Sequence, residues 1–304
     1  MTKNLDQPTL AIFANFFIDN DERLKRMKDS FLSFKNVHPN EWVINIRGSF
    51  KYEAGNFLKK ELGDQISLFY LKSSQGWLYD SRIITHKIDS NYILFWIEDH
   101  ILVDTPANLK NCIVEMSKLN VDQLSYSFLT REAKNMFSII EPYKLGSYIK
   151  VQRLDAEACL KIRKLFSEFY IISCVSIMHK KFFRKVLLSP KPYLKRWPLD
   201  VPFDFEKKSK DKVAKVIWHA IPNNELFAPI DDDTSEPGYS LISRGLYPNR
   251  VSRSSLKYIE FGYSDKKRQK LKDMVPKIIR PLALFIFHYV RSVYYTINYL
   301  IKNW

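Results

Sequence analysis

Through the first 128 residues, short apolar segments rich in β-branched and aromatic residues alternate with segments of helical character. The strand-like segments are 10–18, 41–46, 66–71, 92–97 and 121–128, and the helical segments are 21–34, 52–62, 77–87 and 108–119. Alternation of this kind with short connections requires a mostly parallel sheet covered by helices. We therefore predict an α/β fold.

One predicted strand, residues 92–97, is apolar throughout and runs directly into Glu98, Asp99 and His100. An uninterrupted apolar run is typical of a strand that is buried on both faces. Ligands of open α/β sheets bind just outside the carboxyl ends of the strands, and carboxylate and imidazole groups there can reach a divalent metal. The triplet is therefore a candidate metal site, although an acidic strand-to-loop junction with an exposed histidine explains the same residues.

The composition indicates an ordered protein with reduced thiols. Of the 304 residues, 46% are hydrophobic, which argues against a disordered chain. Cys112, Cys159 and Cys174 are far apart in apolar surroundings, which predicts buried thiols in a cytosolic compartment. The polar residues 1–8 lack the pattern of a signal peptide. Glycine-rich phosphate loops and the GxSxG, GxGxxG and HExxH motifs are absent.

The net charge of +15 is concentrated near the C-terminus, where residues 266–304 hold nine Lys or Arg and one acid. Residues 282–301 predict a helix with a wide apolar face and a thin basic stripe, as in helices that lie in a membrane interface. The preceding basic cluster would attract anionic lipid. We therefore predict an anionic membrane surface as the partner of residues 266–304. A helix packed on the protein's own core is the alternative, and the many aliphatic residues argue against nucleic acid.

In the order and spacing of these segments, residues 8–225 resemble the GT-A nucleotide-sugar glycosyltransferases, in particular the large inverting family 2. In that family a hydrophobic strand ends in an acidic metal motif, at the place that Glu98, Asp99 and His100 occupy here. The resemblance implies Mn²⁺ or Mg²⁺ bound by Glu98 and His100, with Asp99 at the donor. A downstream histidine often completes the site, and His219 has that place, with a packing role as the alternative.

The resemblance also implies donor contacts from two other segments. The helix before the metal strand often carries an Arg for the diphosphate or sugar, where this chain has Asp80 and Arg82. Arg82 as a simple surface residue is the alternative. The second strand of the family usually ends in acids that hold the nucleoside, but this chain has only Asn45 and Ser49 there. The identity of the donor nucleotide is therefore left open.

The family's general base follows a later strand, which residues 170–178 resemble. Asp204 and Glu206 fit this role, because a carboxylate can deprotonate the acceptor hydroxyl as it attacks the anomeric carbon. Asp204 as a helix cap is the alternative. The acidic run 231–233 offers Asp233 as a further candidate base, and a solvated turn explains the same run.

The sequence thus predicts a glycosyltransferase domain in residues 1–262, with a nucleotide-binding part at 8–130 and an acceptor part at 131–262, and a basic helical tail at 263–304. The expected reaction moves a sugar from a nucleotide-sugar to a glycan or lipid-linked saccharide in bacterial surface polysaccharide or lipopolysaccharide synthesis. Inversion is implied by the resemblance alone. The expected location is cytoplasmic, peripheral on the inner face of the cell membrane. The alternative is a non-catalytic, basic membrane- or nucleic-acid-binding protein with a degenerate α/β domain.

Overall fold

The computed structural model describes residues 7–71, 84–128, 139–165, 171–188, 214–231 and 237–251, with the single positions 256, 276, 286 and 290. These residues form a nine-stranded sheet in the order β3-β2-β1-β4-β9-β6-β10-β8-β7 and a two-stranded sheet of β11 and β5. The strands are β1 (Leu10–Phe17), β2 (Glu41–Arg47), β3 (Ile66–Tyr70), β4 (Tyr92–Trp96), β5 (His100–Leu102), β6 (Gln123–Ser125), β7 (Lys144–Leu145), β8 (Ile149–Leu154), β9 (Ser176–His179), β10 (Ile217–Pro222) and β11 (Phe227–Pro229).

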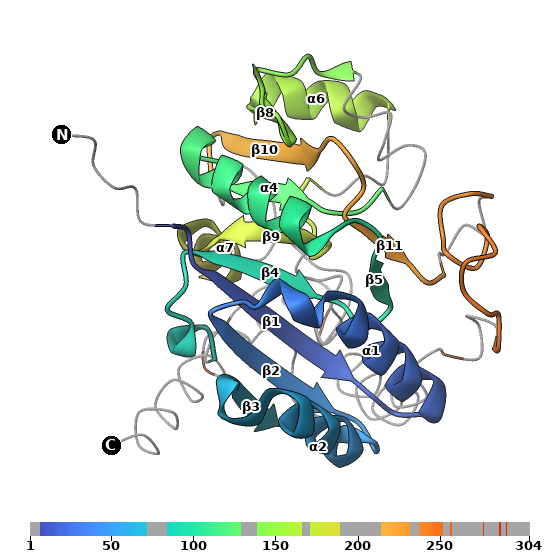
Figure 1. Ribbon diagram of the computed structural model, residues 1–304. Coiled ribbons are helices and arrows are strands. Elements are labelled where there is room, and N and C mark those ends of the chain that lie inside the picture. Colours follow the sequence, from blue (N-terminus) through green and yellow to red (C-terminus); the bar gives the residue numbers. More distant parts are fainter. Residues whose placement is uncertain are drawn as a thin grey trace.

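Helices cover both faces of the large sheet (Figure 1). The α-helices are α1 (Asp21–Phe34), α2 (Lys51–Leu62), α4 (Pro106–Leu119), α6 (Ala156–Leu165) and α7 (Lys180–Leu188). Short 3-10 turns follow at η1 (Lys35–Val37), η2 (Gly63–Gln65) and η3 (Thr85–Lys87). In Figure 1, α1, α2 and α4 lie in front of the sheet and α7 lies behind it.

The sheet is mostly parallel, which confirms the predicted α/β class. β1 pairs in parallel with β2 and β4, β2 with β3, and β6 with β10. β9 differs, because it lies antiparallel between β4 and β6. β8 is antiparallel to both β10 and β7 at the far edge. The architecture is therefore a mixed sheet whose parallel half carries the N-terminal residues.

The complete burial of β1 and β4 places the core on both faces of these central strands. Every residue of β1 and of β4 is buried, as expected for central strands covered on both faces. Trp96 packs edge-on against Phe16 and Phe34 on the α1 side, with ring centroids 4.6 and 5.1 Å away. Phe95 points the other way, toward Phe183 of α7, at 6.3 Å.

Helix α1 begins as its sequence predicts. Asn20 has an extended backbone, and its side chain accepts a hydrogen bond from the backbone N–H of Arg23 at 2.9 Å. Asp21 and Glu22 follow in the first turn, where the positive end of the helix dipole favours acids. The cap fixes where the helix leaves the carboxyl end of β1.

Of two further predictions about secondary structure, one is wrong in its bounds and the other lies mostly outside the described residues. Residues 213–218 are strand-like in sequence and predict a strand that ends before His219. That prediction is wrong in its bounds, because β10 runs over Ile217–Pro222 and includes the histidine. Antiparallel pairing with β8 over Ile149–Leu154 sets the longer extent of β10. The predicted helix 77–87 lies outside the described residues, apart from its last residues at positions 84–87.

The predicted tail, residues 263–304, also lies outside the described residues, apart from three single positions. Within the described part of the chain, no helix has the length and apolar character that crossing a membrane requires. The interfacial helix at 282–301 and the two-domain division therefore stay predictions.

Candidate functional site

The strand order of the large sheet reverses between β1 and β4. The chain passes from β1 to β2 and β3 on one side, and β4 then pairs with β1 on its other side. Open α/β sheets bind ligands outside the carboxyl ends of strands at such a reversal. The residues that follow β1 and β4 therefore line the candidate site.

The carboxyl ends of β1 and β2 are joined tightly. The backbone N–H of Ile18 donates to the carbonyl of Arg47 at 2.8 Å. Gly48 has a positive φ of 97°, and a Cβ there would collide with the Ile18 carbonyl, so only glycine fits. Ser49 is exposed, and its hydroxyl donates to the Asp19 carbonyl at 2.9 Å. These contacts hold the start of α1 in a fixed place.

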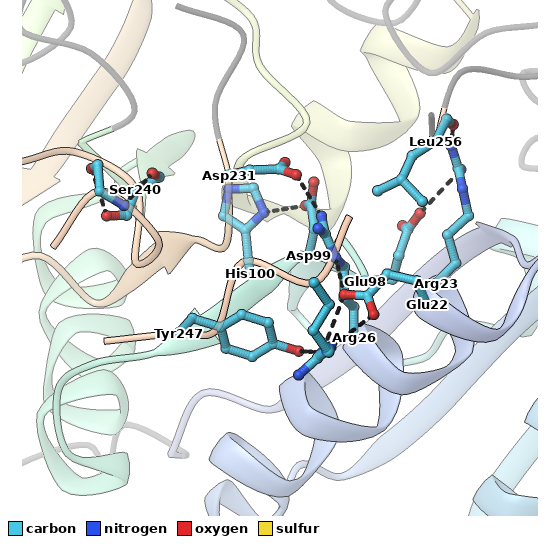
Figure 2. Close-up of polar contacts among 12 residues, drawn as sticks. Glu22, Arg23, Arg26, Glu98, Asp99, His100, Asp231, Ser240, Tyr247 and Leu256 are labelled. Atoms are coloured by element: carbon cyan, nitrogen blue, oxygen red, sulfur yellow. Dashed lines mark hydrogen bonds and ion pairs between the residues drawn. The ribbon is translucent and has the colours of Figure 1, made fainter. Parts of the chain in front are cut away.

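Arg23 connects the end of β1 to the end of β4 (Figure 2). Its Nε lies 3.2 Å from the Asp19 carboxylate, and its Nη1 lies 3.8 Å from Oε1 of Glu98. The same guanidinium donates to the backbone carbonyls of Phe17 and Leu256. Arg23 thereby fixes one side of the acidic triplet to helix α1.

Arg26, one helical turn further, is 2% exposed and joins helix α1 to the segment that follows β11. Its Nε donates to Oε1 of Glu22 at 2.9 Å, and its Nη1 donates to Oδ2 of Asp231 at 2.6 Å. Burial alone would lower the pKa of Arg26, but the hydrogen bonds to Asp231 and Glu22 and the nearby Asp99 carboxylate outweigh burial and raise it. Arg26 is therefore a charged group that its acidic partners hold in the interior.

The triplet itself contains a histidine oriented by its neighbour. Nδ1 of His100 lies 2.8 Å from Oδ1 of Asp99, and the His100 side chain is nearly buried at 4% exposure. The Ser30 hydroxyl donates to the His100 carbonyl and accepts from Nε1 of Trp96, which anchors this turn on α1. Burial and the Asp99 charge raise the pKa of Glu98 to about 6, with Arg23 opposing part of that shift.

The ends of β1 and β4 form two sides of the candidate site. A third side, which we name the third wall, consists of the described residues that follow β10 (227–231 and 237–251). β11 pairs with β5, so that Pro229 lies opposite His100, and the N–H of Ile230 donates to the Asp99 carbonyl at 2.7 Å. A small apolar cluster of Ala228, Ile230 and Leu241 then packs with Ile101, Ile242 and Tyr247. Residues 227–230 are thereby held against the end of β4, and residues 241–247 pack on them.

Arg250 ties the same wall to α1. Its Nε and Nη2 donate to the Glu22 carboxylate at 2.8 and 3.1 Å. Its Nη2 also donates to the Tyr247 hydroxyl at 2.5 Å, and that hydroxyl donates to Oδ2 of Asp29 at 2.6 Å. Burial raises the pKa of Glu22, but the hydrogen bonds from Arg250 and Arg26 outweigh burial and lower it overall.

We name these charged groups the carboxyl-edge network. It consists of six carboxylates and three guanidinium groups: Asp19, Glu22, Asp29, Glu98, Asp99 and Asp231 with Arg23, Arg26 and Arg250. The carboxylates outnumber the guanidinium groups, although the whole chain carries a net charge of +15. The site is thus an acidic centre within a basic protein.

Two of the predicted donor residues lie on β2 or just after it. Asn45 is fully buried within the strand, opposite Asn15 of β1, and neither of its side-chain polar atoms has a hydrogen-bond partner among the described residues. Ser49 follows β2, and its hydroxyl contacts the β1–α1 loop at the Asp19 carbonyl. Asp99 belongs to the network. Asp80, Arg82, Asp204, Glu206 and Asp233 lie outside the described residues.

His219 is not brought to the triplet. It lies within β10, which is separated from β4 by β9 and β6 in the sheet. Its Nε2 is 3.0 Å from the Ser125 hydroxyl, and burial lowers its pKa to about 3. The side chain is therefore a neutral imidazole in the interior, away from Glu98 and His100.

The predicted metal ligands do not converge in this structure. Among the described residues, no group of three His, Cys, Asp or Glu side chains is arranged to hold a metal ion. Glu98 faces Arg23, and Asp99 faces His100. Nε2 of His100 is buried and has no hydrogen-bond partner in the part of the chain that the structure describes. This is a feature of histidines whose second nitrogen binds a metal, but it provides a single ligand. The described residues alone do not fit a resident metal.

The sequence analysis missed the arginines of α1 and the role of Asp231. A signal for the arginines exists, because Arg23 and Arg26 fall on the same helical stripe as the buried Met27, Phe31 and Phe34. A basic residue on the stripe that should be apolar indicates a buried ion pair. No local signal identifies Asp231 as the partner of Arg26, because the two residues are 205 positions apart.

No protein-family model and no curated protein matches the chain. The chain is structurally similar, at low sequence identity, to residues 1–349 of S. aureus TarS, with a TM-score of 0.45, 10% identity, and 72% of this chain and 59% of that chain covered. The same TarS fragment in complex with UDP gives a TM-score of 0.43, 10% identity, and coverage of 72% and 59%. The mannosyltransferase PcManGT from Pyrobaculum calidifontis, in complex with GDP-Man and Mn²⁺, gives 0.31, 11% identity, and coverage of 42% and 37%. The chain spans less than two thirds of each of these proteins, and TM-scores below 0.5 do not assign a function.

Proposed function

We propose that the chain is a GT-A-type glycosyltransferase that moves a sugar from a nucleotide-sugar donor to a glycan or lipid-linked acceptor. The observation that carries the proposal is the position of Glu98, Asp99 and His100. They follow β4 directly beside β1, at the reversal of strand order where open α/β sheets bind nucleotides. An acidic, largely buried triplet there, held by arginines of α1, is costly unless a ligand uses it.

The residues of the network have separable roles in this proposal. Arg23 and Arg26 hold the carboxylates of the site in fixed positions through α1. Asp99 orients the His100 ring, so that one imidazole nitrogen is committed to Asp99. Glu98 has its pKa raised to about 6, so it exchanges a proton near neutral pH, a property that is common at catalytic sites.

The general base is proposed among the three carboxylates predicted from the sequence. Asp233 lies two positions after Asp231, whose carboxylate binds Arg26 at 2.6 Å. This closeness along the chain favours Asp233 over Asp204 and Glu206. The base would take the proton of the acceptor hydroxyl as that oxygen attacks the anomeric carbon, and the bond to the donor diphosphate breaks. An inverting outcome follows from such a single displacement.

Membrane association and location remain part of the proposal. Residues 266–304 would lie on anionic lipid at the inner face of the cell membrane, where a lipid-linked acceptor in surface polysaccharide synthesis is available. Truncation after Val275 is expected to release the protein from membranes, and unchanged partition would contradict this assignment.

A thermal-shift screen against UDP-, GDP-, dTDP- and CMP-sugars tests the function. Each nucleotide is added in EDTA, with Mg²⁺ and with Mn²⁺, because the described residues leave the metal requirement to experiment. A ligand at about 100 times its dissociation constant stabilises the folded state by about 2.7 kcal/mol. We expect one nucleotide class to raise the melting temperature.

The matched variants are Glu98→Gln, within the site, and Glu157→Gln, whose carboxylate is 81% exposed in a surface ion pair. We expect the nucleotide response to weaken in Glu98→Gln and to persist in Glu157→Gln. The absence of any nucleotide response in all three metal conditions, with salt-sensitive binding of nucleic acid instead, would support the non-catalytic alternative.

A further inference from the structure

Exposed hydrophobic side chains gather at the edge of the sheet farthest from β3. Nine large hydrophobic residues within the described part of 7–251 are exposed, and five of them fall between positions 143 and 165. These five are Tyr143, Leu145, Tyr148, Leu160 and Leu165. Exposed hydrophobic residues that are scattered singly need no explanation, whereas a concentration of them marks an interaction surface.

Three of the five belong to one turn, which we name the edge hairpin, residues 143–150. β7 is its outer strand and the last strand of the sheet, pairing only with β8 among the described strands. Leu145 is 73% exposed and Tyr143 is 59% exposed. The hairpin lies beside β8 and α6, at the top of Figure 1, at the opposite side of the molecule from α2 and β3.

The edge hairpin is rigidly supported from below. The Glu115 carboxylate of α4 accepts three backbone hydrogen bonds, from Ser147, Tyr148 and Ile149, each at 2.8 Å. A Cβ on Gly146 would collide with that carboxylate. The turn is therefore held against α4, and its apolar side chains are presented to solvent in one arrangement rather than folded back.

The charge around the hairpin identifies its partner. Residues 139–165 contain six Lys or Arg and three acids. Lys144 places its Nζ over the rings of Tyr143 and Trp218, at 5.5 and 5.8 Å from their centroids. The hairpin itself, residues 143–150, contains two Lys and no acid, with Lys144 between the exposed side chains of Tyr143 and Leu145. Such a segment matches the interfacial region of an anionic bilayer, where rings and aliphatic groups enter the headgroup layer and lysines meet phosphate.

Nucleic acid is the other polyanion that a basic surface of this kind would fit. It uses aromatic rings for stacking, but it has no use for exposed aliphatic side chains. Leu145, Leu160 and Leu165 are 73%, 54% and 61% exposed. The aliphatic residues therefore favour lipid.

We propose that the edge hairpin, residues 143–150, is a docking surface of the folded domain for anionic lipid bilayers. It is a second membrane contact, separate from residues 266–304, and it does not depend on the proposed reaction. A bilayer at this surface contacts the sheet at its β7 edge.

Site-specific labelling of the full-length protein tests the contact directly. Cys112, Cys159 and Cys174 are buried, so an environment-sensitive dye reacts selectively with an introduced surface cysteine. Leu145→Cys places the dye on the hairpin, and Leu246→Cys places it on a leucine of similar exposure, 68%, in another segment. With phosphatidylglycerol-containing vesicles, we expect a blue shift and quenching by brominated lipid at position 145 only.

Two results would overturn the proposal. The protein fails to bind the vesicles, or it binds them while the dye at position 145 keeps its emission in water. The second result would assign the contact to another part of the chain. The dye reports contact whatever the strength of binding through residues 266–304.

Vesicle partition provides a second, independent measurement. We expect Leu145→Glu to lower the partition coefficient by about tenfold. The substitution removes an aliphatic side chain that would enter the bilayer and adds a charge that anionic lipid repels. Leu246→Glu changes the same residue type at matched exposure and should leave partition within about twofold. Equal losses in both variants, or binding to RNA with no binding to vesicles, would contradict the lipid assignment.

Discussion

Two buried polar regions of this molecule differ in charge: one consists of charged side chains and the other of neutral ones. The carboxyl-edge network joins charged side chains from α1, the end of β4 and residues 231–250. A second region, which we name the polar row, aligns Gln123, His219 and Gln152 across β6, β10 and β8 in one register. The polar row contains neutral groups, of which Gln123 and Gln152 donate to backbone carbonyls of Ile171 and Ile140.

The difference shows in the two histidines that the sequence proposed as metal ligands. His100 has a carboxylate at 2.8 Å on Nδ1 and lies beside an acidic group with a raised pKa. His219 has a hydroxyl at 3.0 Å on Nε2, and burial lowers its pKa to about 3. An excess of buried charge is costly and indicates a ligand site, whereas a row of neutral polar side chains within the sheet is a structural element of the core.

Removing the guanidinium of Arg26 should produce the largest effect. Arg26→Met leaves the buried carboxylates of Glu22 and Asp231 without this partner, and their side chains are only 11% and 13% exposed. We expect a loss of about 3–5 kcal/mol in the free energy of unfolding, measured by urea denaturation at pH 7.5. Arg26→Lys should recover part of the loss.

The matched control is Lys161→Met, which breaks another i,i+4 ion pair, with Glu157. Its side chains are 60% and 81% exposed, so the loss should stay below about 0.5 kcal/mol. Equal effects of the two substitutions would show that the network is no more than a set of surface ion pairs.

The pH dependence of stability should separate the two regions next. The folded-state pKa of His219, about 3, lies below its ordinary value, so the unfolded chain binds the extra proton between pH 6.5 and 3. Stability is therefore lost as pH falls through that range, by about 1.4 kcal/mol per unit, or about 2 kcal/mol between pH 7 and 5.

The check compares urea unfolding of the wild type and His219→Gln at several pH values. Whatever the stability of the variant at pH 7, its decline between pH 7 and 5 should be smaller by about 2 kcal/mol. Identical slopes would mean that His219 is charged in the folded state and does not belong to a neutral row.

The strong local patterns predicted much of the fold. β1, α1 and β2 lie within one residue of their predicted bounds, because apolar periodicity and the Asn20 cap are encoded locally. We did not predict the β7–β8 hairpin or α6. β7 has two residues and depends on pairing with β8 rather than on its own sequence. The bounds of β10 were missed for the same reason.

The residues of the candidate site also divide into those that a local sequence pattern predicted and those that depend on distant pairing. Glu98, Asp99 and His100 were found because they are contiguous and follow an apolar strand. The pairing of Arg26 with Asp231 was not found, because it forms only when β11 pairs with β5. His219 was assigned to the site from its place in the chain order, but the strand order separates it from β4.

Glu98 should show the opposite pH dependence from His219. Its pKa is raised to about 6, so the folded state binds the extra proton, and stability rises as pH falls from about 6 toward the ordinary value of 4.5. Above pH 6 the ionised side chain lowers stability by about 2 kcal/mol. Glu98→Gln should therefore stabilise the protein at pH 7.5 by about 1–2 kcal/mol and have little effect at pH 4.5. Destabilisation at pH 7.5 would mean that Arg23 compensates the charge fully.

The smallest expected effect tests whether the third wall belongs to the network. Tyr247→Phe removes the hydroxyl that donates to Asp29 and accepts from Arg250, and leaves the ring in its apolar cluster. A single hydrogen-bonding group of this kind contributes about 1 kcal/mol.

Tyr143→Phe is the control, because that side chain is 59% exposed and should change stability by less than about 0.5 kcal/mol. Local hydrogen exchange at residues 237–251 should rise in Tyr247→Phe while exchange at the polar row stays unchanged, since the row lies on β6, β10 and β8 of the large sheet. Equal changes in both regions would show that network and row unfold as one unit, and the distinction between a ligand site and a core element would then rest on charge alone.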